Sequence, residues 1–328
     1  MNRHISHNLP TIYADVNVFR YVAYGEMVID KPERFRWLYS YAHLDAIFRS
    51  GNADSLEGMR KLGAVEVTDV LDDQFRSIGN VQICQYIEPE ARYEQHLQTI
   101  SGFEHAGESN VEYLLRIFGA DNFTELSLAP DQLRIEVDRL TSGLDPLIRD
   151  DLIERAASIS IKAGQFIEDQ MKDTRSLQDF RTELGLGNQE REKSGNSTSP
   201  IDAIWELIGD SVGEVSKQQF FGFEPILESD EIQRTQHGSI AGAYTVLNLL
   251  GLKADSGLTR REKIHNAISD SQHVGMASYC NALLSADRKL CAKANAIYVH
   301  LHSATRALDF DYAPEGFTLY LTATHTTQ

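Results

Sequence analysis

Short apolar runs alternate with helical patterns at both ends of the chain. The runs at 12–14, 35–39 and 282–285 have the length and the residue types of buried strands. Amphipathic patterns predict helices from His43 onward and over 56–62 and 288–304, while the run at 81–86 fits either a strand or the start of a helix. Near the end of the sequence, the alternating segment GFTLYLTAT predicts a terminal strand.

Two further helices are predicted after residue 200. The segment IDAIWELIGD has an apolar face, whereas HGSIAGAYTVLNLLGL is apolar around most of its circumference and contains several small residues. Such a composition is typical of a helix that packs closely, and we expect it to lie on a sheet face. Because strands alternate with helices, the pattern indicates an α/β layer built on a parallel sheet.

The middle of the chain differs from its two ends. Residues 88–236 hold 30 of the 48 acidic and 14 of the 31 basic residues, a net charge of −16, and helical periodicity dominates from about 90 to 185. The polar stretch GLGNQEREKSGNSTSP at 185–200 predicts a flexible loop. We therefore divide the chain into a core of residues 1–87 and 237–328 and an acidic helical insertion of residues 88–236.

Composition restricts the class of protein. No apolar run is long enough to span a membrane, and the N-terminus MNRHISHNLP has no signal-peptide core, so we expect a cytoplasmic protein without membrane contact. The three cysteines lie in apolar patterns without metal-type spacing, which predicts free thiols. The net charge of −17 disfavours nucleic acid as a partner, but the two outer segments are nearly neutral.

Three aspartates follow or flank the predicted strands of the core. Asp15 ends the first strand, Asp287 follows the strand at 282–285, and we expect Asp270 at the N-terminal end of the preceding helix. Each has a simple alternative role as a turn residue or helix cap. If the two strands are neighbours, however, the carboxylates meet at one sheet edge, where their repulsion calls for a cation. Oxygen ligands alone indicate Mg²⁺ or Mn²⁺.

The segments TIYADVNVFRYV and ISDSQHVGMASYCNALLSADRKLCAKANAIY resemble the PIN-domain (PIN-like) nucleases. The resemblance covers about residues 10–87 and 237–300. It implies a three-layer α/β/α core with a central parallel sheet and a large helical insertion. It also implies that Asp15, Asp270 and Asp287 are metal ligands and catalytic residues, that the Ser285 hydroxyl supports them, and that Asn17 is a polar neighbour.

The sequence departs from the PIN-like pattern at two places. The second acid of the family would fall at Ala46, and Asp45 is the nearest acid that can complete the pocket. Asn281 stands where many relatives have another acid, and an amide oxygen can bind a metal but brings no charge. Two histidines, His43 and His273, are candidates for contacting a phosphate or orienting a ligand, and each also has an ordinary structural alternative.

Basic residues near the expected site provide candidate contacts to substrate phosphate. These are Arg20, Arg288 and Lys289. Together these features predict a metal-dependent nuclease in which metal-activated water hydrolyses a phosphodiester bond, with RNA favoured over DNA as substrate.

Two alternatives remain open. One is a catalytically weak or inactive PIN-like module that binds RNA or a protein partner. The other is a metal-dependent phosphohydrolase acting on small nucleotides. The acidic insertion is compatible with shielding of the site, with a homodimer and with binding of a regulatory protein.

Overall fold

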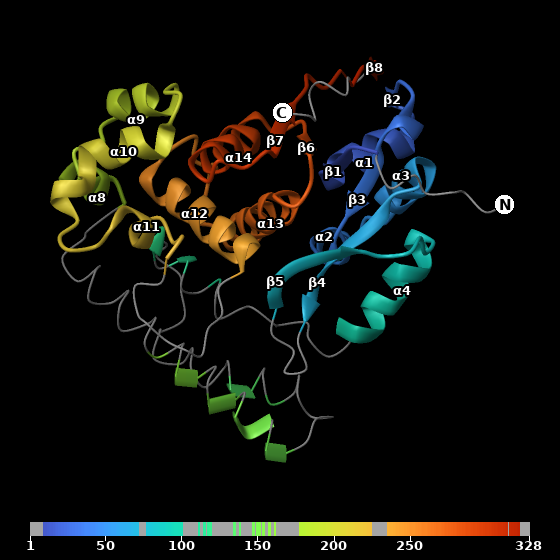
Figure 1. The fold of residues 1–328 in the computed structure, drawn as a ribbon, viewed down its shortest axis with the longest axis horizontal. Coiled ribbons are helices and arrows are strands. Elements are labelled where there is room, and N and C mark those ends of the chain that lie inside the picture. Colours follow the sequence, from blue (N-terminus) through green and yellow to red (C-terminus); the bar gives the residue numbers. More distant parts are fainter. Residues whose placement is uncertain are drawn as a thin grey trace.

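The computed structural model describes residues 9–71, 77–100, 177–224, 235–313 and 315–321, and scattered residues between 111 and 161. Strands and helices alternate in the first hundred residues (Figure 1). These elements are β1 (Thr11–Ala14), α1 (Val16–Tyr24), β2 (Met27–Ile29), β3 (Arg36–Tyr39), α2 (Tyr41–Ser50), α3 (Asp54–Leu62), β4 (Val65–Leu71), β5 (Ser77–Ile83) and α4 (Pro89–Ile100).

The second half of the chain is mainly helical until its last hundred residues, where strands return. Its elements are α8 (Leu177–Glu183), α9 (Asn188–Gly195), α10 (Pro200–Ile208), the 3-10 helix η3 (Gly209–Ser211), α11 (Lys217–Phe220), α12 (Gln236–Leu250), α13 (Arg261–Ala277), β6 (Ala282–Ser285), α14 (Arg288–His300), β7 (Arg306–Asp309) and β8 (Phe317–Leu319). Strands from both ends of the sequence therefore build one core.

Six strands form the main sheet in the order β5-β4-β3-β1-β6-β7. All neighbouring pairs are parallel except β4 with β5, so the sheet is mixed but mostly parallel. Strands β2 and β8 form a separate parallel pair. In the main sheet Ala14 lies opposite Leu284, and the chain therefore leaves β1 and β6 at the same edge. The predicted α/β class is confirmed, and β1 and β6 are neighbours, which is the condition for their following aspartates to share an edge.

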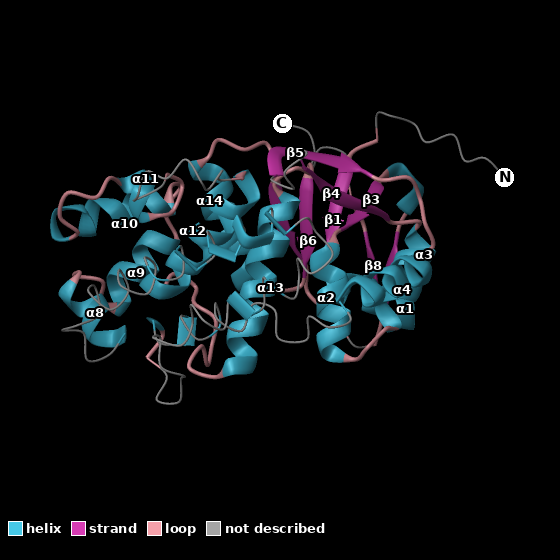
Figure 2. Ribbon diagram, turned by 90° about the horizontal axis from the view of Figure 1, so that it is seen from below, coloured by secondary structure: helices cyan, strands magenta, loops and turns pink. Residues whose placement is uncertain are grey.

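Helices cover both faces of the main sheet (Figure 2). Along β1, Tyr13 packs into the apolar core shared with α12, α13 and α14, whereas Ile12 and Ala14 pack into the core shared with α1, α2 and α3. This alternation follows from the two-residue period of a strand. Helices cover both faces of the central strands, which explains why β1 (TIYA) and β6 (ALLS) are mostly apolar.

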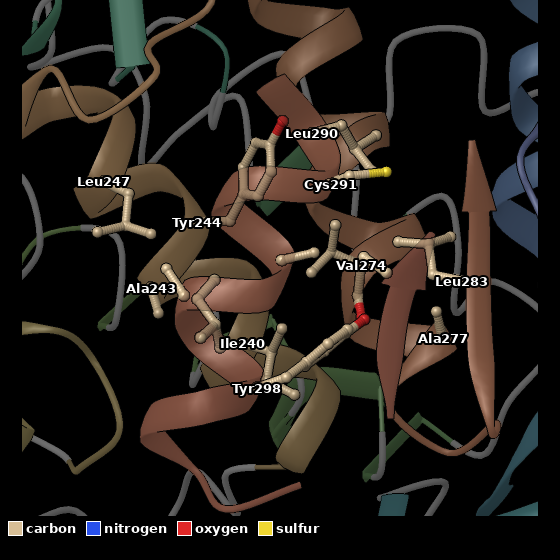
Figure 3. Close-up of a cluster of buried hydrophobic side chains, with 14 of the residues drawn as sticks. Ile240, Ala243, Tyr244, Leu247, Val274, Ala277, Leu283, Leu290, Cys291 and Tyr298 are labelled. Atoms are coloured by element: carbon tan, nitrogen blue, oxygen red, sulfur yellow. The ribbon is translucent and has the colours of Figure 1, made fainter. Parts of the chain in front are cut away.

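Helix α12 packs on α13, whereas we expected a sheet face as its main partner. Gly275 of α13 allows the close approach, because a Cβ atom there would lie 2.6 Å from the carbonyl oxygen of His237. Side chains from α12, α13, β6 and α14 fill the space between these elements (Figure 3). They include Ile240, Ala243, Tyr244, Leu247, Val274, Ala277, Leu283, Leu290, Cys291 and Tyr298.

The predicted insertion is joined to the core in its described C-terminal part. Leu186, Ile201 and Phe221 belong to the same buried cluster as Tyr13 and Leu283. The predicted loop at 185–200 is wrong in part, because α9 is helical; its sequence NQEREKSG consists largely of good helix formers. Between 101 and 176 the predicted helical periodicity lies outside the described residues, apart from scattered positions.

Other boundaries differ modestly from the predicted ones. In the ambiguous run at 81–86, residues 81–83 belong to β5 and residues 84–86 follow it, and α14 ends at His300, earlier than expected. The described cysteines are free thiols, of which Cys280 and Cys291 are buried. Within the described ranges, no helix combines the length and apolar character that a membrane span requires.

Candidate active site

Asp15 lies where β1 ends, beside the end of β6. Its backbone N–H donates to the carbonyl oxygen of Leu284 at 2.9 Å, and the buried Ser285 Oγ donates to Asp15 Oδ2 at 2.8 Å. Burial raises the pKa of Asp15, while hydrogen bonds from Ser285 and the Asn17 side chain lower it. Asn17 and Ser285 are therefore where the sequence predicts them, against the carboxylate of Asp15.

Asp287 follows Ser285 by two residues and also contacts its hydroxyl. Its N–H donates to Ser285 Oγ at 3.1 Å, so Ser285 contacts both aspartates. Asp287 Oδ1 accepts the N–H groups of Lys289 at 2.7 Å and Leu290 at 2.9 Å, which makes it the N-cap of α14. Asp287 can therefore cap α14 and also take part in a site beside Asp15, because only one of its two carboxylate oxygens accepts the capping hydrogen bonds.

Asp270 lies in the middle of α13, which begins at Arg261, and the expected position at a helix start is wrong. Its side chain is half-buried, and the charge of Arg49 acts on its carboxylate. Its pKa is raised well above 3.8, first by burial and then by the charges of Asp15, Asp255 and Asp287. These effects place Asp270 in the electrostatic neighbourhood of the other two predicted aspartates.

A lysine that the sequence analysis missed lies in the same neighbourhood. Lys293 of α14 is fully buried, and its Nζ donates to Asp255 Oδ1 at 2.6 Å and to Asn248 Oδ1 at 2.9 Å. Its charge lowers the pKa of Asp270. The available signal was its place in RKLCAKANAIY, three residues after the apolar Leu290 and so on the buried side of the helix.

The two candidate histidines are buried beside β1, inside the protein. His43 Nε2 donates to the carbonyl oxygen of Ala14 at 2.7 Å, and its Nδ1 accepts the Ser40 N–H at 3.1 Å. His273 Nδ1 lies 2.9 Å from the Tyr13 hydroxyl, and its buried Nε2 has no partner among the described residues. Burial lowers the pKa of both to about 3, so neither is a cation that attracts phosphate at neutral pH.

Asp45 is directed to a different partner. Its Oδ1 lies 2.8 Å from His96 Nε2 of α4. The neighbouring Ala46, at the position of the family's second acid, is half-buried and has no ligating group. Asp45 thus links α2 to α4. Among the described residues, no contact supports its predicted role in the pocket.

The predicted place of Asn281 at the site is wrong. Asn281 precedes β6, and its Oδ1 accepts the Thr11 N–H at 2.8 Å and the Thr11 hydroxyl at 2.9 Å. Ser285 is at the other end of the same strand, about 13 Å away at 3.3 Å per residue. Asn281 therefore ties together the starts of β1 and β6, at the sheet edge opposite Asp15.

The candidate phosphate contacts have partners of their own. Arg288 is exposed and pairs with Asp311 and, at 3.7 Å, with Asp309. Lys289 Nζ donates to the carbonyl oxygen of Ala254 at 2.9 Å. Arg20 lies over the ring of Tyr21, 5.7 Å from its centroid. Exposed pairs of this kind are weak, typically ~0–1 kcal/mol, so they leave the basic side chains available to a stronger partner.

The carboxylate oxygens of Asp15, Asp255, Asp270 and Asp287 are ligands that a hard divalent cation prefers, although the charges of Arg49 and Lys293 also act on Asp270. Even so, no three His, Cys, Asp or Glu side chains in the described ranges are arranged as a ready group of metal ligands. Binding of a cation would thus require these side chains to move closer.

Comparisons of the chain with protein-family models, with curated proteins and with solved structures find no match. The resemblance to PIN-like nucleases therefore rests on the residues quoted above.

Proposed function

We propose that this protein is a metal-dependent nuclease of the PIN-like type, with an α/β/α core. The observation that supports the proposal is the meeting of Asp15 and Asp287 through Ser285 at the carboxyl edge of a mostly parallel sheet, with the charge of Asp270 in electrostatic reach. In sheets of this type, ligands bind at the carboxyl ends of the strands.

Asp15, Asp270 and Asp287 would hold a Mg²⁺ or Mn²⁺ ion. When bound, such an ion activates a water molecule and neutralises charge on the scissile phosphate. Hydrogen bonds from Ser285 and Asn17 favour the ionised form of Asp15, against burial, which raises its pKa. The N-cap contacts fix the orientation of Asp287, and they leave one of its oxygens free to bind the metal.

Substrate phosphate would meet basic side chains at the same edge. Arg288 and Lys289 occupy the first turn of α14, directly after Asp287, and both are exposed. Their present partners are weak surface contacts that a phosphate can replace. RNA as the substrate follows from the resemblance to PIN-like nucleases, most of which cut RNA.

A second candidate function is a PIN-like module that binds RNA or a protein without cleaving it. Two observations favour it: Ala46 provides no acid, and the described carboxylates do not form a ready metal group. This candidate keeps the fold and the phosphate contacts but lacks the metal-activated water.

The deciding experiment incubates the full chain with labelled single-stranded RNA, and with DNA of the same sequence, in the presence of Mn²⁺. Asp15→Asn and Asp287→Asn are tested beside Asp210→Asn, an exposed control on η3. Asn is also a good N-cap, so the Asp287 variant should fold. We expect both site variants to lose cleavage and the control to retain it.

Two results would contradict this function. Cleavage that persists in both site variants would exclude these carboxylates as the metal ligands. Absence of any cleavage, with RNA bound by the wild type and the control, would favour the binding module.

A further inference from the structure

Tyr21 of α1 and Tyr312, which follows β7, form a stacked pair of rings that we call the tyrosine stack. Their ring centroids are 4.3 Å apart, and their planes differ by 21°. Phe310 lies edge-on to Tyr21 at 6.5 Å, and Phe317 lies edge-on to Tyr312 at 6.4 Å. Both phenylalanines pack against the core around α1, so they hold the tyrosines in place. Tyr312 nevertheless has an exposed fraction of 39%, and the stack therefore presents an aromatic surface to solvent.

Two arginines lie beside the tyrosine stack. The guanidinium of Arg20 is 5.7 Å from the ring centroid of Tyr21, a cation–π contact. Arg288 is exposed and pairs with Asp311, the residue before Tyr312. A guanidinium next to an aromatic ring provides a positive charge for a phosphate and a second planar group for a base.

The tyrosine stack adjoins the candidate site. Strand β7 is parallel to β6, so the segment that follows β7 leaves the sheet at the edge where Asp287 follows β6. On the other side, Tyr21 is six residues after Asp15, about 9 Å along the axis of α1. Arg288 connects the two features, because it directly follows Asp287 and contacts Asp311.

The charges around the stack nearly cancel. The two arginines are offset by three carboxylates, of which two pair with Arg288 and one accepts the Tyr312 hydroxyl at 3.0 Å: Asp309, Asp311 and Glu26. A phosphate chain alone therefore gains little at this surface, and a ligand must bind through its planar groups. The bases of a single strand have free faces that stack on aromatic rings, whereas the bases of a duplex are stacked on one another.

We propose that the tyrosine stack, with Arg20 and Arg288 beside it, binds the bases of single-stranded nucleic acid next to the carboxylate edge. This inference rests on the proposed function and deepens it, because it makes a single strand the substrate. Stacking requires no metal ion, so binding can be measured apart from cleavage.

The test measures, by fluorescence anisotropy and with EDTA present, the affinity of the full chain for labelled RNA of about twelve nucleotides. Three probes of equal length are compared: the single strand, the same strand annealed to its complement, and an abasic strand that keeps the sugar–phosphate chain without the bases. We expect the single strand to bind at least about tenfold more tightly than either of the others, because only its bases can stack on the tyrosines.

Substitutions locate the binding surface. Tyr312→Leu removes one ring of the stack and should weaken binding of the single strand by about tenfold, whereas Tyr312→Phe keeps the ring and should stay within about twofold of the wild type. Tyr86→Leu is the matched control. Tyr86 is 40% exposed, and its hydroxyl likewise donates to a glutamate, Glu88, at 3.0 Å, so its loss should leave the affinity unchanged.

Several results would overturn the inference. These are no binding of the single strand by the wild type, equal or tighter binding of the abasic strand or the duplex, and equal affinity of Tyr312→Leu and Tyr86→Leu. The comparison of the three probes uses the wild type alone, so it decides the question even if Tyr312→Leu does not fold.

Cleavage of RNA with Mn²⁺, measured on the same proteins, separates this inference from the proposed function. If the wild type cleaves RNA and Tyr312→Leu binds the single strand as tightly as the wild type does, the proposed function stands and the inference fails. If the wild type binds the single strand through Tyr312 but cleaves nothing, the metal-dependent function fails and the inference stands.

Discussion

Ser285 Oγ donates a hydrogen bond of 2.8 Å to Asp15 Oδ2, across 270 positions of the sequence. The same oxygen accepts the N–H of Asp287 at 3.1 Å. Ser285 is fully buried, and its hydroxyl therefore has these two partners in place of water. One small side chain thus couples the two strand ends on which the candidate site depends.

Replacing Ser285 by Ala should weaken Mn²⁺ binding at neutral pH by about tenfold or more, because a hydrogen bond to a charged group contributes roughly 1.5–3 kcal/mol. The lost bond is one that lowers the pKa of Asp15, so that pKa should rise further and the affinity curve should move to higher pH. Titrations with Mn²⁺ across a pH series measure both effects. Ser303→Ala, in the turn after α14, is the matched control and should bind Mn²⁺ as the wild type does. Identical Mn²⁺ affinity curves for Ser285→Ala and the wild type would refute the coupling.

The placement of Asp15 and Asp287 was predictable because it depends on local patterns. An apolar strand followed by an acid, and a Ser-x-Asp turn before a helix, each fix their own geometry within a few residues. Asp270 was harder, because the helical pattern of α13 begins at Arg261 and its polar residues obscure where the helix starts. The carboxylate was assigned to the correct region but to the wrong turn of the helix.

The Lys293 network was beyond prediction for a physical reason. Its members come from α12, α14 and the segment between α12 and α13, and only packing brings Asn248, Asp255 and Lys293 together. Asn281 shows the complementary error. The resemblance to the PIN-like pattern placed it at the site, but β6, a strand of four residues, separates it from the site by its whole length.

Asp270 should make the metal-free protein less stable as pH rises. Its folded-state pKa is raised well above 3.8, so between these two values the folded state binds more protons than the unfolded state, and the free energy of unfolding falls with increasing pH. Urea unfolding with a chelator present, from pH 4 to 8, measures this slope.

We expect Asp270→Asn to flatten the slope and to be more stable than the wild type at pH 8. Asp202→Asn is the control: Lys217 lowers the pKa of Asp202, so its removal should leave the loss at high pH in place. A slope that is identical in wild type and Asp270→Asn would show that the pKa of Asp270 is not raised in the folded state.

The buried histidines should make the protein less stable as the pH falls into the acid range. The pKa values of His43 and His273 are lowered from 6.5 to about 3, so the unfolded state binds more protons in this interval and stability falls as pH falls through it. His273→Phe keeps a ring of similar size and should make this acid loss shallower, whatever its effect on absolute stability. Urea midpoints at pH 4, 5, 6 and 7 test this, and parallel curves for the two proteins would contradict it.

Asn281 should affect stability and leave the site unchanged. Asn281→Leu leaves the partly buried Thr11 N–H without its acceptor, which costs about 1–3 kcal/mol, while Asn281→Asp retains an acceptor oxygen and should be nearly neutral. Neither should change Mn²⁺ affinity by more than about twofold, because Asn281 is at the opposite end of β6. Tighter Mn²⁺ binding by Asn281→Asp would instead return this position to the site.

Gly58 controls the position of the helix that follows Asp15. A Cβ atom at Gly58 of α3 would lie 1.8 Å from the carbonyl oxygen of Phe19 on α1, so Gly58→Ala must push the two helices apart. We expect a loss of about 3 kcal/mol in the free energy of unfolding, measured by urea titration. Gly242 on α12 is the matched control: nothing lies within 4 Å of its Cβ position, and Gly242→Ala should gain about 0.5–1 kcal/mol from helix propensity. Equal stability of the two variants would mean that α1 and α3 are not in close contact at Gly58.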